Sequence, residues 1–401
     1  MQSKTTPFLF LGALSAFSLL AFDLYQPALP AMTTYFNTSH ALAQLTLSLY
    51  LFAFGFSQLI WGPLIDHYGR RRVFPMSLIV FFIATFACIF AINIEMLIIA
   101  RAIQGFAMCC CSVLYFSSSR DIEDCRERAR LISRISMIVS ISPILAPIIG
   151  SLVYIHTASW RSTFMIMLLV GLCVLAAGYA TLRESPYWFK PANPFLIKKS
   201  LQTYREILSH KYLWIGILII TASYSAMMIV IINSAYLLID RLHLSPLSFA
   251  IAFAANGLTI IIGNFIGIQL RKHYSLYWNI RAGGFLITTG AAFMMLLYWS
   301  WGFTLLYLAP VLLINMGITL TNPPTLSLVL TRYTQEAGTA TAVINMVRMT
   351  FSAIAASLIG VLLIYHVFLL SVSLFSCGII CFRLSYLFND KEEPLNLAIS
   401  K

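Results

Sequence analysis

Three ionisable side chains lie in stretches of this sequence that are otherwise apolar. Asp23 is the only acidic residue well inside any such stretch, and Arg101 and Arg348 are basic residues in similar positions. A charged side chain near the centre of a lipid bilayer costs about 2.5 to 3.5 kcal/mol on insertion scales, so these positions are functional candidates by default. The chemistry that they offer is reversible protonation and the binding of ions of opposite charge.

Asp23 and Arg101 fall at a similar predicted depth in the membrane. With a helical rise of about 1.5 Å per residue, Asp23 lies about 24 Å along its apolar stretch and Arg101 about 9 Å below the outer surface. Burial favours the neutral form of a carboxyl group, whereas a nearby arginine favours its charged form. We therefore expect Asp23 to take up a proton from outside and release it inside, in competition with cargo, while Arg101 holds the deprotonated state. A static ion pair between two helices is the alternative.

Arg348 lies about 18 Å along another apolar stretch, near the predicted midplane of the membrane. No acidic residue in the second half of the sequence lies at that depth. A buried cation without a protein partner usually faces water or an anionic ligand, which predicts that Arg348 binds a carboxylate, catecholate or phosphate group of the cargo. Pairing with Asp23 across a central cavity is the competing interpretation.

The composition of the chain indicates a membrane protein. Hydrophobic residues make up 60% of its 401 residues and charged residues only 10%, compared with about 25% charged residues in soluble domains. Crossing a bilayer takes about 20 apolar residues per helix. Twelve such runs predict an all-α membrane protein with twelve transmembrane helices, at 8–31, 41–64, 73–93, 96–118, 133–155, 160–182, 211–239, 246–270, 280–300, 303–323, 337–364 and 367–388.

The polar stretch 183–210 divides these runs six and six. We predict an N-terminal six-helix bundle over 1–182, a cytoplasmic linker with an interfacial helix over 183–210, and a C-terminal six-helix bundle over 211–401. With the N-terminus inside, 22 of the 26 lysine and arginine residues fall in inner loops and flanks, as the positive-inside rule requires. Both termini are therefore predicted to be cytoplasmic, and the net charge of +12 needs no nucleic acid to explain it.

A segment rich in glycine and arginine follows the second apolar run, with the sequence Gly62-Pro63-Leu64-Ile65-Asp66-His67-Tyr68-Gly69-Arg70-Arg71-Arg72. We expect its proline and glycine residues to end the helix and its arginines to lie at the lipid headgroups. The carboxylate of Asp66 is placed to sit against the positive N-terminus of a neighbouring helix, a contact worth about 0.3 to 1 kcal/mol. Such a latch would break when two halves of the protein move. A simple topology anchor is the alternative.

This segment resembles the loop 2/3 signature of the major facilitator superfamily. The further segments that resemble motifs of this superfamily, or of its Bcr/CflA drug:proton antiporters, are Phe22-Asp23-Leu24-Tyr25-Gln26-Pro27-Ala28-Leu29-Pro30 in the first helix, Arg101-Ala102-Ile103-Gln104-Gly105 in the fourth, and Pro143-Ile144-Leu145-Ala146-Pro147-Ile148-Ile149-Gly150 in the fifth. A departure lies at Asn233-Ser234-Ala235-Tyr236, which lacks the proline expected in that subfamily. The motifs therefore do not identify the class of the transported substrate.

The resemblance implies the major facilitator fold, in which two six-helix bundles enclose a cavity lined by helices 1 and 4. It also implies a proton-coupled antiporter that exports small organic molecules, such as drugs or related metabolites, by alternating access across the bacterial inner membrane. One alternative is an exporter dedicated to a natural metabolite such as a siderophore. Another is a proton-coupled uptake symporter on the same fold.

The candidate site residues fall into three groups. Asp23 and Arg101 are expected to couple protons to transport. The residues expected to bind substrate are Asp23, Tyr25, Gln104, Asn233, Tyr236, Asn345 and Arg348. Those expected to serve the conformational change are Gly62, Asp66, Gly69, Arg70, Arg71, Pro143, Pro147 and Gly150.

Prolines and glycines in two later runs predict helices suited to relative motion. Pro143 and Pro147, four residues apart, remove backbone donors from one face of their helix and bend it. Gly263 and Gly267 give another helix a small-residue face that permits close packing. We expect both helices at the interface between the two halves.

Other classes of protein are disfavoured by the sequence. No P-loop, metal-ligand cluster or paired nucleophile and base occurs at usable spacing, so we predict no enzyme, no metal and no cofactor, with an ion gradient as the energy source. The eight cysteines, including Cys109, Cys110 and Cys111, are expected to pack within apolar spans. No run has the continuous polar stripe that a single-chain channel needs. The expected partners are a small-molecule substrate, protons and the lipid bilayer, with the chain a monomer that binds no nucleic acid.

Overall fold

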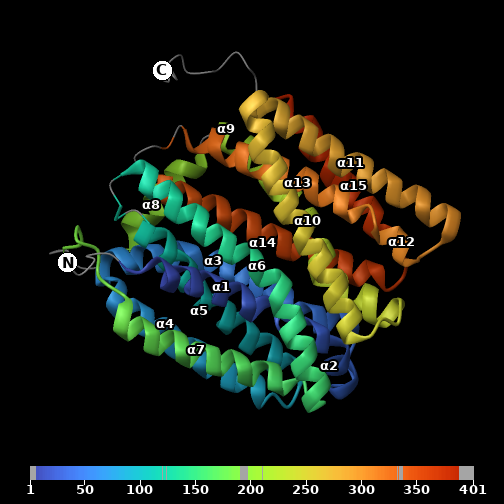
Figure 1. The fold of residues 1–401 in the computed structure, drawn as a ribbon, viewed down its shortest axis with the longest axis horizontal. Helices are drawn as coiled ribbons and strands as arrows, with labels where there is room; N and C mark the ends of the chain where they lie inside the picture. The colour runs from blue at the N-terminus through green and yellow to red at the C-terminus, as the bar shows by residue number, and fades with distance from the viewer. Residues whose placement is uncertain are drawn as a thin grey trace.

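The computed structural model describes residues 6–119, 121–122, 124–189, 197–209, 211–331, 333 and 337–387. These residues are helical apart from short connections and include no β-strand (Figure 1). The helices are α1 (Phe8–Asp23), α2 (Leu29–Tyr35), α3 (His40–Tyr68), α4 (Arg70–Ile89), α5 (Ile94–Ser119), α6 (Cys125–Thr157), α7 (Arg161–Thr181), α8 (Ile197–Ser209), α9 (Lys211–Ala235), α10 (Pro246–His273), α11 (Leu276–Trp301), α12 (Leu305–Leu308), α13 (Val311–Leu330), α14 (Ala337–Leu363) and α15 (Leu369–Ser385).

The prediction of an all-α membrane protein is confirmed. Within the described ranges, ten helical segments are long and apolar enough to cross a membrane, and two further apolar helices, Ile141–Thr157 and Leu369–Ser385, are shorter. Together they fall on the twelve predicted runs. Several residues predicted at the inner face lie outside the described residues: Lys4, Arg120, Lys190, Arg332, Lys391 and Lys401.

Two groups of helices lie side by side in Figure 1. The first helix group, α1 to α7, is drawn from blue to green, and the second helix group, α9 to α15, from yellow-green to red. Helix α3 packs along α14, and α6 packs against α10, so these four helices join the groups. The short helices α2 and α12 lie at the opposite end of the molecule from α8.

The first predicted span is interrupted at Asp23, its candidate functional residue. Helix α1 ends at Asp23, and a single 3₁₀ turn, Gln26–Ala28, leads into α2. Pro27 and Pro30 explain the interruption, because a proline has no N–H to donate to the carbonyl four residues earlier. Asp23 therefore lies at the end of a helix, not within one as the sequence suggested.

Helix α3 extends beyond the predicted end of the second span. The expectation that proline ends this helix is wrong, because Pro63 lies inside α3, but the expectation for glycine holds, because α3 continues to Tyr68 and ends at Gly69 with a φ of 82°. Such a left-handed φ favours glycine. Pro63 deprives the carbonyl of Leu59 of its helical donor. The hydroxyl of Tyr204, on α8, donates to that carbonyl at 2.9 Å.

Helix α6 contains both predicted prolines, Pro143 and Pro147, and packs against both helix groups. Gly150 lies against the interruption of the first span, since a Cβ at this position would be 1.8 Å from the carbonyl oxygen of Leu24. The next residue, Ser151, donates at 2.7 Å to the carbonyl of the first residue of α10. Close packing of α6 beside Asp23 therefore requires a glycine at position 150.

The prediction that these two helices, α6 and α10, meet at the interface between the halves is confirmed, because α6 packs against α10, but Gly263 and Gly267 do not make that contact. Both glycines of α10 lie against α13 of the same helix group, where a Cβ at Gly263 would be 2.4 Å from the hydroxyl of Thr319. The glycine of α10 that approaches the first helix group is Gly257, which packs against Ile144 of α6. Spacing alone identifies a close-packing face and does not identify the helix that it meets.

Two spans of the second helix group contain irregular turns. Helix α9 continues into a π-helical turn, Tyr236–Arg241, and the tenth predicted span is divided between α12 and α13 at Ala309 and Pro310. A π-helical turn is rare and is frequently found at a functional site.

Candidate functional site

Asp23 lies at the interruption of the first span and is only 4% exposed. Gln26 is fully buried in the following 3₁₀ turn and donates from Nε2 to Asp23 Oδ1 at 2.8 Å. Ser234 of α9 donates to the amide oxygen of Gln26 at 3.5 Å. The carboxyl group of the first helix group is thus connected, through Gln26, to the second helix group.

Arg101 of α5 is fully buried beside this interruption. Its guanidinium lies between the rings of Tyr25 and Tyr50, 4.3 Å from each ring centroid. It donates to the carbonyl of Ala21 at 3.0 Å and to the side-chain oxygen of Gln104. Among the described residues, Nε and Nη2 find no hydrogen-bond acceptor. The two aromatic faces take that place, and a desolvated cation–π contact is worth about 2 kcal/mol.

The two tyrosines around Arg101 are themselves held by hydrogen bonds. The hydroxyls of Tyr25 and Thr46 lie 2.7 Å apart, and the hydroxyl of Tyr50 donates to the carbonyl of Ser18 at 3.2 Å. Gly105 lets α5 approach α3 closely, because a Cβ there would be 2.3 Å from the carbonyl oxygen of Tyr50. The position of the guanidinium is therefore set by three helices, α1, α3 and α5.

Asp23 and Arg101 are neighbours without forming a direct ion pair. In the part of the chain that the structure describes, no nitrogen of Arg101 lies within 4.0 Å of the Asp23 carboxylate. Gln104, which was predicted to bind substrate, accepts from Arg101 and donates to Thr85 at 2.8 Å. Both ends of its amide are thus engaged in orienting the guanidinium.

Arg348 and Asn345 lie on α14 and are both half-buried. The guanidinium of Arg348 lies 4.4 Å from the ring centroid of Tyr224 on α9. Its Nε has no hydrogen-bond partner within the described ranges, and no ion pair joins it to Asp23 there. Arg348 therefore retains donors for a ligand.

Asn233 and Tyr236 lie near the end of α9. Asn233 is fully buried and donates from Nδ2 to the carbonyls of Ile229 at 2.8 Å and Ala356 at 3.3 Å. Tyr236 is 5% exposed, and its ring centroid lies 4.9 Å from that of His40. These two predicted substrate-binding residues therefore face different helices in this structure, Asn233 facing α14 and Tyr236 facing α3.

The arginine-rich segment forms a network at the other end of the first helix group. Arg70 pairs with Asp121 and donates to Ser117 at 2.9 Å. The carboxylate of Glu184 accepts from the backbone N–H groups of Arg70 at 2.9 Å and Arg71 at 3.2 Å. A carboxylate at the N-terminus of a helix is stabilised by the helix dipole, and for α4 that carboxylate belongs to Glu184.

The predicted latch residue Asp66 is exposed, and its backbone carbonyl accepts from Nε1 of Trp188 at 2.9 Å. Gly69 turns the chain so closely that a Cβ there would be 2.6 Å from the Glu184 carboxylate. Gly62 has open space, with no atom within 4 Å of the place that a Cβ would take. The predicted role of Asp66 as a latch stays a prediction.

Sequence reasoning missed four residues of these networks: Gln26, Tyr50, Asp121 and Glu184. Gln26 had a signal, since it lies three residues after Asp23, a spacing that permits a local contact. Tyr50 had none, because the helices that bring it to Arg101 are distant along the sequence. Glu184 lies in the stretch that was interpreted only as a linker.

A buried carboxylate and a stacked guanidinium inside a bundle of apolar helices are typical of a membrane transporter. Among the described residues, no group of three or more His, Cys, Asp or Glu side chains could hold a metal ion. The chain belongs to the Major Facilitator Superfamily, whose sequence profile matches residues 11–357.

Curated relatives and solved structures agree with this membership. The uncharacterized MFS-type transporter YdgK of Bacillus subtilis is 27% identical over 357 residues, which are 88% of this chain and 87% of that protein. The multidrug resistance protein MdtL of Shigella dysenteriae is 30% identical over 218 residues, 54% of each chain, so the match spans about half of MdtL. The crystal structure of a D-xylose-proton symporter superimposes with a TM-score of 0.74 at 15% identity, covering 94% of this chain and 95% of that one. The predicted major facilitator fold is confirmed.

Proposed function

We propose that this transporter is a proton-coupled antiporter of the Bcr/CflA type that exports small organic molecules across the bacterial inner membrane. The observation that carries the proposal is the environment of Asp23. Its carboxyl group is buried at a helix interruption, bonded to Gln26 and adjacent to the fixed charge of Arg101. Burial favours the neutral form and the arginine favours the charged form, so a change in access to water changes the protonation of Asp23.

Protonation of Asp23 would change the contact between the helix groups. In the structure the Gln26 amide donates to the carboxylate, and the opposite end of the same amide accepts from Ser234 of α9. A proton arriving from outside adds to an oxygen of Asp23 and removes the charge that orients the Gln26 amide. After the helix groups rearrange, the proton leaves to water on the inside and cargo takes part in restoring the charged state.

The fixed position of Arg101 supports this scheme. Two tyrosine rings, Ala21 and Gln104 hold the guanidinium. Its charge therefore stays in place while the access of Asp23 to water changes. We infer that Arg101 stabilises the deprotonated form of Asp23 more in one arrangement of the two helix groups than in the other.

The two helix groups would be the moving bodies, with boundaries at 1–182 and 211–401 and the linker 183–210 between them. Contacts of α6 with α10 and of α3 with α14 lie between these bodies. Pro143 and Pro147 bend α6, and Gly150 lets it pass close to the interruption of the first span. These features favour rocking about the centre of the molecule, as in other transporters built from two bundles.

The proposed direction of transport rests on the sequence motifs and on one relative. The Pro-x-x-Ala-Pro-x-x-Gly segment ending at Gly150 resembles the antiporter motif, and MdtL is named a multidrug resistance protein. The proposed cargo site comprises Tyr25, Asn345, Arg348 and the residues around them. Because Arg348 has no ion partner among the described residues, an exporter dedicated to an acidic metabolite such as a siderophore is the second candidate.

Transport by purified protein in proteoliposomes tests the proposal. The compounds would be a cationic dye, a zwitterionic amphenicol and a carboxylate siderophore, with an internal pH indicator as the readout. We expect proton movement opposite to at least one compound, and we expect Asp23→Asn to abolish it. Glu95→Gln, at an exposed carboxylate in the first turn of α5, is the matched control and should retain it.

Two results would contradict the proposal in different ways. Coupled proton movement that persists in Asp23→Asn would show that another group carries the proton. Proton movement in the same direction as the compound would identify a symporter.

A further inference from the structure

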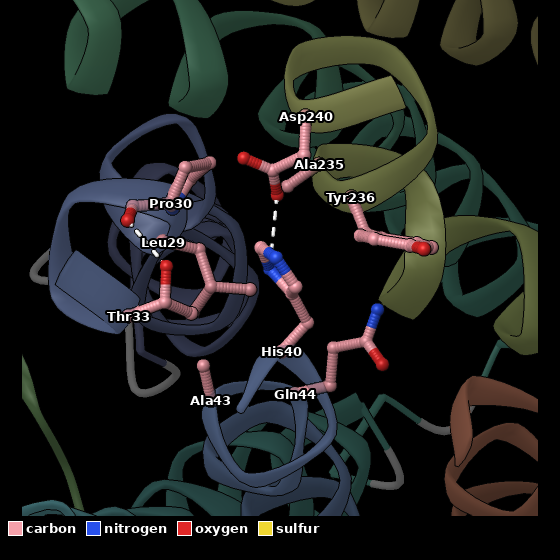
Figure 2. Close-up of a pocket in the computed structure, with 9 residues that line it drawn as sticks. All are labelled: Leu29, Pro30, Thr33, His40, Ala43, Gln44, Ala235, Tyr236 and Asp240. Atoms are coloured by element: carbon pink, nitrogen blue, oxygen red, sulfur yellow. Dashed lines mark hydrogen bonds and ion pairs between the residues drawn. The ribbon is translucent and has the colours of Figure 1, made fainter. Parts of the chain in front are cut away.

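A small pocket lies between α2, α3 and the π-helical turn that follows α9 (Figure 2). It has room for about one water molecule. The polar and titratable residues on its walls include His40, Gln44, Tyr236 and Asp240. The predicted topology puts this end of the molecule at the outer surface. The proton-coupling scheme above leaves His40, Gln44 and Asp240 without a role.

His40 and Asp240 face each other across the pocket, as Figure 2 shows. His40 is the first residue of α3, and its Nδ1 lies 3.2 Å from Oδ2 of Asp240 in the π-helical turn. The side chains are 38% and 22% exposed, so water reaches both of them. Histidine is the side chain that ordinarily changes charge between about pH 5 and 8. A titratable pair thus joins the two helix groups at the surface.

Gln44 lies one helical turn further into the molecule on α3 and is only 2% exposed. Neither its amide nitrogen nor its amide oxygen has a hydrogen-bond partner within the described residues, and the same holds for Oδ1 of the fully buried Asn233. Both oxygens lie beside Gly360 of α14, at 2.5 and 2.8 Å from the place of a Cβ there. Buried polar groups almost always have partners, so these three atoms indicate an occupant such as water.

A short series of hydrogen bonds leads from Asp23 toward this pocket. Gln26 donates to Asp23 at 2.8 Å, and Ser234 donates to Gln26 at 3.5 Å. Ser234 precedes Ala235, which lines the pocket, so the series ends beside the pocket wall. The contact between Gln26 and Ser234 joins the two helix groups, so it separates when the groups move apart.

We propose that this pocket is the inlet for the protons that Asp23 binds, with His40 as the surface acceptor and Asp240 as its partner. The ligand of the site is the hydrated proton. This inference rests on the proposed function, because it takes Asp23 to be the proton-binding group.

Each transfer along the proposed route from the pocket to Asp23 conserves the proton and requires only water. A proton from external water adds to the free ring nitrogen of neutral His40, whose Nδ1 faces Asp240. It passes to a water molecule held by the amide of Gln44. When Gln26 and Ser234 separate, the proton continues to a carboxylate oxygen of Asp23, and His40 is free to take up the next proton.

Few other charged or titratable groups face this pair within the described ranges. The π-helical turn contributes Tyr236, whose ring faces His40, and Arg241, whose guanidinium lies 5.9 Å from the Tyr236 ring centroid. Helix α2 contributes Thr33 to the pocket and no ionisable group. Asp240 is the carboxylate among the described residues that line this pocket, and replacing it by asparagine removes a local attraction for protons.

The arrival of protons at Asp23 can be measured in reconstituted protein. After a downward step in external pH, the infrared absorption of a protonated carboxylic acid should appear in the wild type and be absent in Asp23→Asn. We expect His40→Gln and Asp240→Asn to slow its appearance about tenfold, with its final amplitude unchanged. His67→Gln, which changes a histidine at the other end of α3, is the matched control and should load at the wild-type rate.

Gln44→Leu tests the interior of the route separately. Leucine is similar in size to the glutamine and apolar, so the buried position stays filled while its hold on water is lost. We expect loading to slow here as well. Slowing in the two surface variants alone would overturn the part assigned to Gln44.

The outcomes separate this inference from the proposed function. Wild-type loading rates in His40→Gln, Asp240→Asn and Gln44→Leu would overturn the inlet and leave Asp23 as the proton-binding group. An absorption change that persists in Asp23→Asn would overturn the proposed function itself.

Discussion

Arg101 and Arg348 both place a guanidinium group inside the bundle, but the two side chains differ in burial and in the number of their contacts. Arg101 is fully buried between two tyrosine rings and also donates to Ala21 and Gln104. Arg348 is half-buried and lies over the single ring of Tyr224. The comparison teaches that two aromatic rings and two acceptors fix Arg101 in the first helix group, whereas Arg348 is more exposed and stacks on one ring.

The prediction with the largest expected effect concerns Arg101. It tests whether the planar shape of the guanidinium is needed to hold this side chain in place. Arg101→Lys keeps the charge but loses planar stacking on two rings, and arginine and lysine are not interchangeable at a stacked site. We expect loss of proton coupling and a lower midpoint of thermal unfolding, because desolvated cation–π contacts are worth about 2 kcal/mol each. Arg348→Lys is the matched control and should unfold near the wild-type temperature. Equal destabilisation of the two variants would remove the distinction between the arginines.

A second test concerns the packing that surrounds Asp23 in the first helix group. Gly150→Ala places a methyl group 1.8 Å from the carbonyl oxygen of Leu24, and overpacking of this kind costs about 1 to 3 kcal/mol. Gly62→Ala is the matched control, because no atom lies within 4 Å of the added methyl group. We expect thermal unfolding in detergent to show a loss for Gly150→Ala and, for Gly62→Ala, a gain of about 0.5 to 1 kcal/mol. Wild-type stability in Gly150→Ala would mean that α6 moves away at little cost.

A third test asks whether Arg348 is available to ligands. Arg348→Ala should weaken the binding of carboxylate compounds about tenfold or more, since a hydrogen bond to a charged group is worth about 1.5 to 3 kcal/mol. Binding of cationic compounds should be unchanged. Equilibrium binding to the purified protein measures both. Equal weakening for acidic and cationic compounds would assign Arg348 a structural role like that of Arg101.

The smallest expected effect concerns the attachment of α8 to the first helix group. Burial raises the pKa of Tyr204 to about 12, and the charge of Asp66 acts in the same direction. The hydroxyl therefore stays protonated and its hydrogen bond to Leu59 is complete below the usual tyrosine value of 10.0. Its contribution to stability is lost as the pH rises from there through about 12.

Tyr204→Phe removes this hydrogen bond and should lower stability by about 1 kcal/mol. The difference in unfolding temperature from the wild type should be constant across neutral pH and should shrink above pH 10.0. Thermal unfolding at a series of pH values measures it. A difference that stays constant above pH 10.0 would show that burial does not raise the pKa of this hydroxyl.

The membrane spans could be predicted because they depend on little beyond the thickness of the bilayer. A run of about 20 apolar residues crosses it regardless of its neighbours, and twelve such runs are found as helices. The interruption after Asp23 also had a local cause in Pro27 and Pro30. It was missed because an apolar run of sufficient length was interpreted as one continuous helix.

The surroundings of Arg101 could not be predicted from local sequence. Tyr50 reaches the guanidinium from α3, and the approach of α3 to α5 depends on Gly105. In the same way, the sequence around Arg70 did not indicate that Asp121 would pair with its side chain or that Glu184 would accept from its backbone N–H. A sequence motif identifies the arginine of such a contact, whereas its partners are determined by the packing of helices that are distant along the sequence.

The proline inside α3 affects how the two helix groups are joined at one end of the transporter. Helix α8 packs on α9 and α14 of the second helix group but is hydrogen-bonded through Tyr204 to Leu59 of the first. Pulling the groups apart at that end must release this hydrogen bond, and pulling them apart at the far end must separate His40 from Asp240 and Ser151 from the carbonyl of Pro246. The amide hydrogen that Pro63 lacks thus lets the linker helix tie the two groups together at one end of the molecule.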